Sequence, residues 1–472
     1  MRPHTIRTFA VAALLLATAA SSPLSAQSTG SRARWEAQAR ALLKELVEIN
    51  TTHSVGNSLT AAEAMAKHMR AAGFPAEDVV VVENAPRKGN LVVRYRGRNT
   101  GRKPILLLSH LDVVEADPKD WTLPPFEFIE RDSVFYGRGV ADDKDEGAIH
   151  LTILLRMKAE GIVPDRDIIV ALTADEEGGP ANGVQWILAN RPELLRAEYA
   201  FNEGGGGRVE EEKKISNDVQ ASEKKVANFS VETTNPGGHS SQPRPDNAIY
   251  QLAAALTKLG NYQFPVHLNE VTREYFRRQA GIVGGETGAA MRAIVANERD
   301  SAASALISRD PANSSRLRTS CVATMLSGGH AMNALPQRAT ATVNCRILPD
   351  ETTESVQARL VAAIGDTGVK VTVSRGAEDS PPSPLTAELM RTIEQTTQEL
   401  WPGMPVVPTM STGATDGRFL RNAGTPVYGI SGLFYEGPNA HGMNEKIEVQ
   451  AFYDGLEFMY RLVRKLSAGP GM

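Results

Sequence analysis

The first half of the chain combines helical spacing of apolar residues with short continuous apolar runs. Helical spacing is present at 35–50, 60–72, 146–160 and 183–190. The runs 104–109 and 167–173 are continuously apolar, as expected of strands buried on both faces, and shorter β-like runs lie at 79–83, 90–95 and 198–202. Strands that alternate with helices predict an α/β fold, with flanking helices around a mixed, mainly parallel sheet.

The pattern changes near Glu223. From 227 to 374 the order is strand, helix, strand, strand, helix, strand, which is typical of a small α+β domain with one exposed sheet face. The stretch 263–318 mixes helix and loop, and we interpret it as an insertion that enlarges this domain. Helical spacing resumes at 388–400 and 447–466 after a proline-rich linker. We therefore predict that 27–224 and 379–472 form one α/β domain, with 225–378 inserted as a second domain.

The N-terminus has a different pattern, with a basic start, an apolar run over 9–20 and the small residue Ala26. This predicts a signal peptide over 1–26 and a periplasmic or secreted protein that begins near Gln27. The 472-residue chain as a whole carries a formal net charge of −4. That balance gives no electrostatic reason to expect a nucleic acid or a membrane surface as a partner.

Only two cysteines are present, Cys321 and Cys345, and they lie on two β-like runs joined by one loop. A hairpin would bring them near one another, which leaves two alternatives: a disulfide, or two buried free thiols. Neither alternative makes them catalytic or metal-binding.

Five polar clusters follow β-like runs or open loops, and together they are hard to explain as ordinary surface. They are S-H-L-D at 109–112, G-R-G-V-A-D-D-K at 137–144, D-E-E-G-G at 175–179, N-E-G-G-G-G at 202–207 and G-P-N-A-H-G-M-N-E at 437–445. On an extended segment His110 and Asp112 point to the same side, so Asp112 could hold the far imidazole nitrogen of a metal-bound His110. In the third cluster, one carboxylate could bind a metal while its neighbour acts as a general base.

At these residues the chain resembles the co-catalytic two-zinc peptidases, which include acetylornithine deacetylase, succinyl-diaminopimelate desuccinylase, aminoacylase and carboxypeptidase S. The matching motifs occur in the family's order: S-H-L-D-V-V, G-R-G-V-A-D-D-K, T-A-D-E-E-G, N-E-G, G-G-H-S-S, N-A-L-P, T-D-G-R and A-H-G-M-N-E. The resemblance implies a catalytic α/β domain with an inserted α+β lid domain, through which such proteins commonly form homodimers.

The resemblance also implies a metal-ligand set. His110 and Glu203 would bind one zinc ion, Glu177 and His441 the other, and Asp142 would bridge the two. Nitrogen and oxygen donors of this kind suit zinc, although cobalt or manganese could occupy the same ligands. A cis peptide bond between Asp142 and Asp143 is implied as well.

Further roles follow from the same resemblance. Glu176 would be the general base, and His239 would stabilise the oxyanion from the partner subunit. Asn333, Arg346 and Arg418 would hold the substrate, and the two arginines suit a bidentate grip on a terminal carboxylate.

The expected function is hydrolysis of a peptide or N-acyl amide bond in a small substrate with a free carboxylate. A carboxypeptidase or dipeptidase is favoured, and an N-acyl-amino-acid amidohydrolase is the alternative, because no motif separates the two. From another class, a non-catalytic binding module on a peptidase fold is disfavoured, because Glu176 and all five ligand positions are present.

Overall fold

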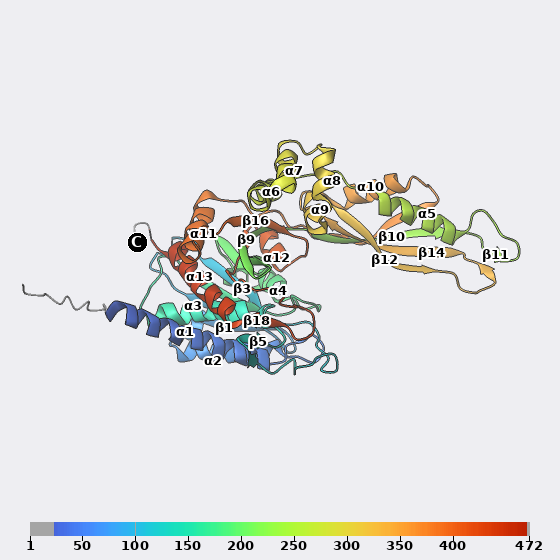
Figure 1. Ribbon diagram of the computed structural model, residues 1–472. Coiled ribbons are helices and arrows are strands. Elements are labelled where there is room, and N and C mark those ends of the chain that lie inside the picture. The colour runs from blue at the N-terminus through green and yellow to red at the C-terminus, as the bar shows by residue number, and fades with distance from the viewer. Residues whose placement is uncertain (1–22, 100, 470–472) are drawn as a thin grey trace, which may run out of the picture.

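The computed structural model describes residues 23–99 and 101–469, and a mixed nine-stranded sheet forms the centre of the larger body (Figure 1). The strand order is β1-β2-β6-β3-β7-β17-β9-β16, with β8 paired to β9. The middle pairs β6–β3, β3–β7 and β7–β17 are parallel. The predicted α/β fold class is therefore confirmed. The strand bounds are β1 (Val79–Ala85), β2 (Lys88–Tyr95), β3 (Ile105–His110), β6 (Ile168–Thr173), β7 (Tyr199–Asn202), β8 (Gly206–Glu210), β9 (Lys213–Glu223), β16 (Val406–Ser411) and β17 (Val427–Gly429).

Helices cover both faces of this sheet, and the strands supply side chains to both cores. In β3, Leu107 packs into the core that contains α1, α2, α3 and α13, whereas Leu106 and Leu108 pack into the core of α4 and α12. Side chains alternate along a strand, so a continuous apolar run serves two cores. The helix bounds are α1 (Pro23–Glu48), α2 (Ser58–Ala71), α3 (Lys144–Ala159), α4 (Gly183–Asn190), α11 (Ala387–Leu400), α12 (Gly417–Asn422) and α13 (Val449–Ser467), with single turns η1 (Ala76–Asp78) and η2 (Pro192–Leu194).

A small three-stranded sheet, in the order β18-β5-β4, lies beside the main sheet. Its strands are β4 (Ile129–Arg131), β5 (Val134–Tyr136) and β18 (Lys446–Glu448). Residues 1–22 of the predicted signal peptide lie outside the described residues. Within the described ranges, no helix combines the length and apolarity that a membrane span requires.

The smaller body is the lid domain, which extends away from the main sheet (Figure 1). Its four antiparallel strands have the order β12-β14-β10-β15, and α5 and α10 pack against them. A two-stranded ribbon, β11–β13, lies at its far end (Figure 1). The bounds are β10 (Lys225–Thr234), β11 (Gly238–His239), α5 (Ala248–Asn261), β12 (Ser320–Gly328), β13 (Ala334–Leu335), β14 (Arg338–Ile347), α10 (Thr353–Ile364) and β15 (Val369–Arg375).

The two cysteines pair across the lid sheet. Cys321 of β12 lies directly opposite Cys345 of β14, and their Cα atoms are 4.1 Å apart. They form a disulfide, which decides between the two alternatives left open by the sequence.

The helices of the segment 263–318 pack on the main sheet, while the residues before them contact the lid: Phe264 belongs to the lid core and His267 forms an ion pair with Asp350. Helix α6 contacts β16 and β9, and the Arg278 guanidinium donates to the Val406 carbonyl (2.8 Å) and to the Glu394 carboxylate (2.6 Å). The expectation that this segment enlarges the lid is therefore wrong: its apolar face covers the β16 edge of the sheet. The helices are α6 (Glu270–Val283), α7 (Gly285–Ala296), α8 (Ser301–Ile307) and α9 (Pro311–Leu317).

Candidate active site

The candidate site lies beyond the carboxyl ends of three parallel strands. His110 is the last residue of β3 and pairs in register with Thr173, the last residue of β6, while β7 ends at Asn202. Parallel strands end at the same edge of a sheet, and ligands bind beyond that edge. The polar clusters that follow these strands, which lie far apart in the sequence, therefore meet here.

Asp142 lies between two histidines. Its Oδ1 is 3.1 Å from His110 Nε2, and its Oδ2 is 3.1 Å from His441 Nε2. His441 Nε2 is also 2.7 Å from Glu177 Oε1. The two oxygens of one carboxylate thus face two different imidazoles, which is the arrangement required of a carboxylate that bridges two ions.

A second group of donors completes the ligand set named from the sequence. Donor atoms of His110, Glu176 and Glu203 lie within 4.8 Å of one another, as do those of His110, Asp142 and Glu177. Burial raises the pKa of Glu203 well above its usual value, and the nearby Glu176 adds to this. Burying several carboxylates together is costly unless cations compensate their charge.

Glu176 is placed to exchange a proton. Burial, assisted by the nearby carboxylate of Asp416, raises the pKa of Glu176 to about 8. A general base works best when its pKa lies near the working pH. The geometry places this carboxyl beside the ligand group and makes it able to take up and return a proton.

A buried ion pair joins the two loops that carry Asp142 and His441. The Arg138 guanidinium is 2.7 Å from Glu445 Oε2, and both side chains are at most 2% exposed. Glu445 also accepts backbone N–H bonds from the 139–141 segment (3.1 and 2.9 Å). Both residues stand in motifs recognised in the sequence, but sequence reasoning gave neither a role, because the contact exists only between distant loops.

The peptide bond between Asp142 and Asp143 is cis, as the resemblance implies. The carboxylate of Asp143 accepts a hydrogen bond from the backbone N–H of His110 (3.1 Å). Asp142 thus faces the histidine rings, whereas Asp143 binds the backbone at the end of β3.

The Asp112 carboxylate accepts hydrogen bonds from groups other than the His110 imidazole that was predicted. His110 Nδ1 contacts the Asp112 carbonyl oxygen at 2.9 Å, whereas the nearer carboxylate oxygen is 3.9 Å away. The carboxylate instead accepts the backbone N–H groups of Glu176 (3.0 Å) and Glu177 (2.9 Å). The prediction that the Asp112 side chain orients the imidazole is therefore wrong, because the 175–177 turn provides two N–H donors that the sequence does not reveal.

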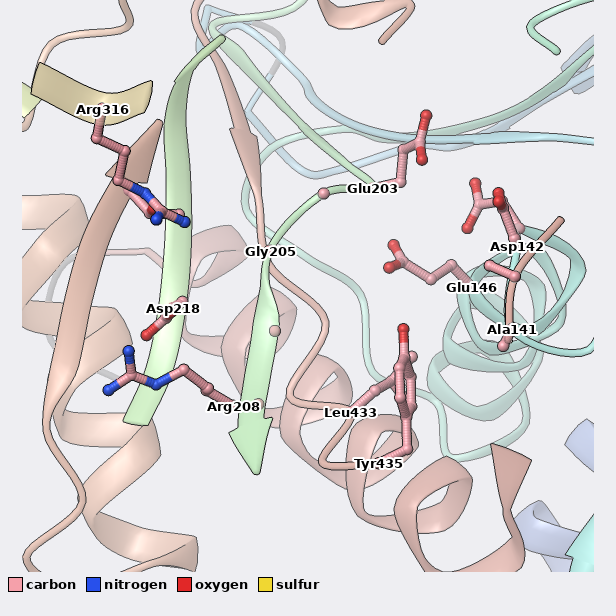
Figure 2. Close-up of a pocket in the computed structure, with 16 residues that line it drawn as sticks. Ala141, Asp142, Glu146, Glu203, Gly205, Arg208, Asp218, Arg316, Leu433 and Tyr435 are labelled. Atoms are coloured by element: carbon pink, nitrogen blue, oxygen red, sulfur yellow. The ribbon is translucent and has the colours of Figure 1, made fainter. Parts of the chain in front are cut away.

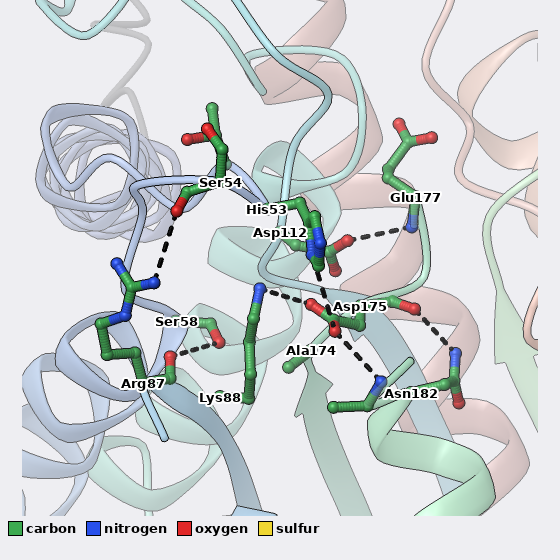
Figure 3. Close-up of polar contacts among 12 residues, drawn as sticks. His53, Ser54, Ser58, Arg87, Lys88, Asp112, Ala174, Asp175, Glu177 and Asn182 are labelled. Atoms are coloured by element: carbon green, nitrogen blue, oxygen red, sulfur yellow. Dashed lines mark hydrogen bonds and ion pairs between the residues drawn. The ribbon is translucent and has the colours of Figure 1, made fainter. Parts of the chain in front are cut away.

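Lys88 supports the same turn from a neighbouring strand (Figure 3). Its Nζ is 2.6 Å from Asp175 Oδ1 in a buried ion pair. Asp175 adopts a left-handed backbone (φ 58°), and its carbonyl accepts a hydrogen bond from Asn182 Nδ2 (3.1 Å). These contacts fix the residue that directly precedes Glu176. Lys88 was missed because a single lysine at the start of a β-like run carries no motif.

Two of the predicted substrate residues share a cavity with the candidate base. A cavity of about 400 Å³ is lined by Glu176, Glu177, Arg346 and Arg418. The Arg418 Nε donates to Glu378 (3.1 Å), which fixes its orientation. The structure therefore brings two guanidinium groups to the cavity that Glu176 and Glu177 line.

The third predicted substrate residue, Asn333, lies at the far end of the lid together with His239, the predicted oxyanion residue. His239 lies in β11, which pairs with β13, and the backbone N–H of Ser240 donates to the Asn333 carbonyl (3.0 Å). Figure 1 places β11 at the lid tip, away from the main sheet. The chain does not bring these two residues to its own ligand group.

The chain belongs to peptidase family M20/M25/M40. The family model matches residues 106–465, a range that contains all five ligand positions and the candidate base. The chain is thus a peptidase or amidohydrolase of this metallopeptidase family, as the resemblance predicted.

Several known proteins are similar to it. Human N-fatty-acyl-amino acid synthase/hydrolase PM20D1 is 29% identical over 78% of this chain and 75% of its own length. The probable carboxypeptidase S-like 2 of Dictyostelium discoideum is 29% identical over 79% of this chain and 74% of its own length. Among solved structures, the M20 family metallo-carboxypeptidase Sso-CP2 from Sulfolobus solfataricus has a TM-score of 0.64 at 18% identity, covering 89% of this chain and 97% of that one.

Proposed function

We propose that the chain is a two-zinc hydrolase that cleaves a peptide or N-acyl amide bond next to a free carboxylate, as a carboxypeptidase or dipeptidase does. The main support for this proposal is that Glu176 and Glu177, which belong to the two candidate ligand groups, line one cavity together with Arg346 and Arg418.

The residues fit two zinc ions. The five donors are imidazole nitrogens and carboxylate oxygens, which suit zinc. Asp142 offers one oxygen toward each histidine, so His110 and Glu203 would hold one ion and His441 and Glu177 the other. When bound, such ions lower the pKa of a water molecule and polarise a carbonyl group.

Glu176 carries the proton through the reaction. It accepts a proton from the attacking water, whose oxygen forms a bond to the amide carbon. It then delivers that proton to the amide nitrogen as the carbon–nitrogen bond breaks, so that the products are a carboxylic acid and an amine. The carboxyl returns to its starting state.

Arg346 and Arg418 hold the substrate's free carboxylate. Their guanidinium groups line the same cavity as Glu176, and a fork of N–H donors matches a carboxylate. Anchoring this end places the neighbouring amide bond beside the base.

Activity requires a homodimer in this proposal. His239 would donate to the oxyanion of the partner's site, because the lid tip lies away from its own ligand group. The outer strand β12 is exposed, with Val322 59%, Met325 69% and Leu326 71% exposed. An exposed apolar edge strand is suited to pairing with a second copy.

Export is part of the same proposal. A signal peptide over 1–26 would direct the chain to the periplasm or out of the cell. The Cys321–Cys345 disulfide supports this, because disulfides persist in oxidising compartments.

An N-acyl-amino-acid amidohydrolase is the second candidate, favoured by the similarity to PM20D1. The same base and ligands serve both reactions. The difference lies in whether the acyl group carries an α-amine, so only substrates can separate the two.

The test combines metal analysis with hydrolysis of dipeptides and N-acyl amino acids by the wild type and Glu176→Gln. We expect about two zinc ions per chain and a fall in kcat of about 10²–10⁴-fold in the variant with the metal retained. The matched control is Glu286→Gln, an exposed glutamate of α7. Hydrolysis that is unchanged in metal-loaded Glu176→Gln would refute the proposed base, and a binding module is indicated if no substrate is turned over.

A further inference from the structure

A second cavity, of about 430 Å³, begins at the candidate metal ligands Asp142 and Glu203 and does not include Glu176 or the arginines Arg346 and Arg418 (Figure 2). We propose that this cavity holds the acyl part of the substrate and selects an acyl group that ends in a carboxylate. This inference rests on the proposed function, because it assigns the two cavities to the two halves of one cleaved amide.

Two guanidinium groups line the cavity away from the ligands. Arg208 comes from β8 and Arg316 from α9, and Figure 2 shows both on the side opposite Glu203 and Asp142. Arg316 lies with its guanidinium 4.8 Å from the centre of the Tyr275 ring. Among the described residues Arg316 forms no ion pair, and its Nε is buried without a hydrogen-bond partner.

Glu146 lines the cavity on the side of Glu203 and Asp142, away from the two arginines (Figure 2), and the carboxylates nearest the arginines leave positive charge available. Asp218 also lines the cavity, where its Oδ1 accepts a hydrogen bond from Ser216 Oγ (2.5 Å). Glu210 lies 3.6 Å from Arg208 Nε, but its side chain is 62% exposed, so water screens much of its charge. Arg316 therefore has N–H donors without acceptors, and the carboxylate at the end of an acyl group would accept hydrogen bonds from them.

The lining is unsuited to a long saturated acyl chain. Besides glycine and alanine, its apolar members are Leu433 and the ring of Tyr435, while Thr409 and the two arginines are polar. The Thr409 hydroxyl is buried without a partner. Methylene groups placed against these donors would leave them unpaired, which is costly, whereas a carboxylate or its bound water pairs with them.

The inserted helices therefore shape specificity. Arg316 reaches the cavity because α6–α9 pack on the β16 edge of the main sheet. A segment outside both the catalytic motifs and the lid supplies the charged group.

The test compares kcat/KM for succinyl, glutaryl and adipoyl derivatives of one amino acid with the hexanoyl and acetyl derivatives. The amino acid is the one released fastest in the panel described above. We expect the best dicarboxylic substrate to exceed the hexanoyl one at least tenfold. Arg316→Met should reduce that ratio at least tenfold, Arg316→Lys should retain part of it, and Asp218→Asn should increase it. Arg309→Met, an exposed arginine beside the same helix, is the matched control.

The outcomes are separable. A preference for hexanoyl, or a ratio unchanged in Arg316→Met, overturns the inference while acetyl hydrolysis still supports the proposed function. If Arg316→Met does not fold, Asp218→Asn provides the test. A ratio of dicarboxylic to hexanoyl kcat/KM in that variant that is unchanged or lower than in the wild type overturns the inference. If dipeptides are cleaved but no acyl derivative is, the inference fails while the proposed peptidase function stands. If neither class of substrate is cleaved, the proposed function fails as well.

Discussion

The main body and the lid domain carry motif residues of equal clarity in the sequence, yet the fold treats them differently. In the main body, buried contacts such as Arg138–Glu445 and Lys88–Asp175 lock the site residues in place. In the lid, His239 is exposed and contacts its own loop, with Nδ1 2.8 Å from Ser241 Oγ. The body therefore builds a preorganised ligand group within one chain, whereas the lid holds His239 away from that group, and in the homodimer that we propose His239 would complete the site of the second chain.

The largest effect is expected on the stability of the main body when its buried Arg138–Glu445 ion pair is broken. Arg138→Met leaves the Glu445 carboxylate buried without its cation, which should lower the free energy of unfolding by about 3–5 kcal/mol. Urea unfolding measures this. Arg191→Met breaks an exposed pair with Glu193 and should cost less than about 1 kcal/mol. Equal effects of the two variants would show that the body is not stabilised by this buried pair.

The lid residue is tested by mixing two inactive variants, His239→Ala and Glu176→Gln. Each alone should lose activity, by about 10²–10³-fold for the lost oxyanion donor. In a mixed dimer, the His239→Ala subunit keeps Glu176 and receives His239 from its partner. Subunit exchange at equal amounts should therefore restore about a quarter of wild-type activity, because half of the dimers are mixed and half of their sites are intact. No recovery after exchange would place His239 outside the partner's site.

A smaller effect is expected in the body's core, where His150 is buried with Nδ1 2.8 Å from Ser109 Oγ. Burial lowers the pKa of His150 to about 3 from an unfolded value of 6.5. The unfolded chain thus binds a proton between these values, and stability falls as pH falls through this window. At pH 5 the loss is about 2 kcal/mol relative to pH 7. His150→Leu should reduce the change of the urea midpoint between pH 7 and pH 5. A midpoint that changes with pH as much in this variant as in the wild type would show that His150 is not the cause.

Much of the fold was predictable because its signals are local. The apolar runs at 104–109 and 167–173 became β3 and β6, and the helical spacing at 146–160 became α3. Strands β8, β9 and β16 were missed. Charged residues interrupt the short hairpin β8–β9, and serine and asparagine also interrupt β9, so no local apolar pattern marks these strands. Strand β16 pairs with β9, which lies far from it in the sequence.

The candidate site divides in the same way. The candidate ligand motifs were recognisable, because each candidate donor stands in a short motif at the end of a strand or in a loop. The contacts that position these donors were not: Lys88, and the N–H groups that Asp112 holds, belong to segments that meet only in the folded sheet.

The sequence by itself determined the order of elements, the family and the residues that could hold metal, because periodicity and short motifs are written locally along the chain. Only the tertiary structure decided which groups meet. It paired Cys321 with Cys345, brought Arg316 of the inserted helices to the second cavity and kept His239 away from its own ligand group. The physical reason is that these contacts depend on sheet register and on the packing of segments distant in sequence, which local patterns do not specify.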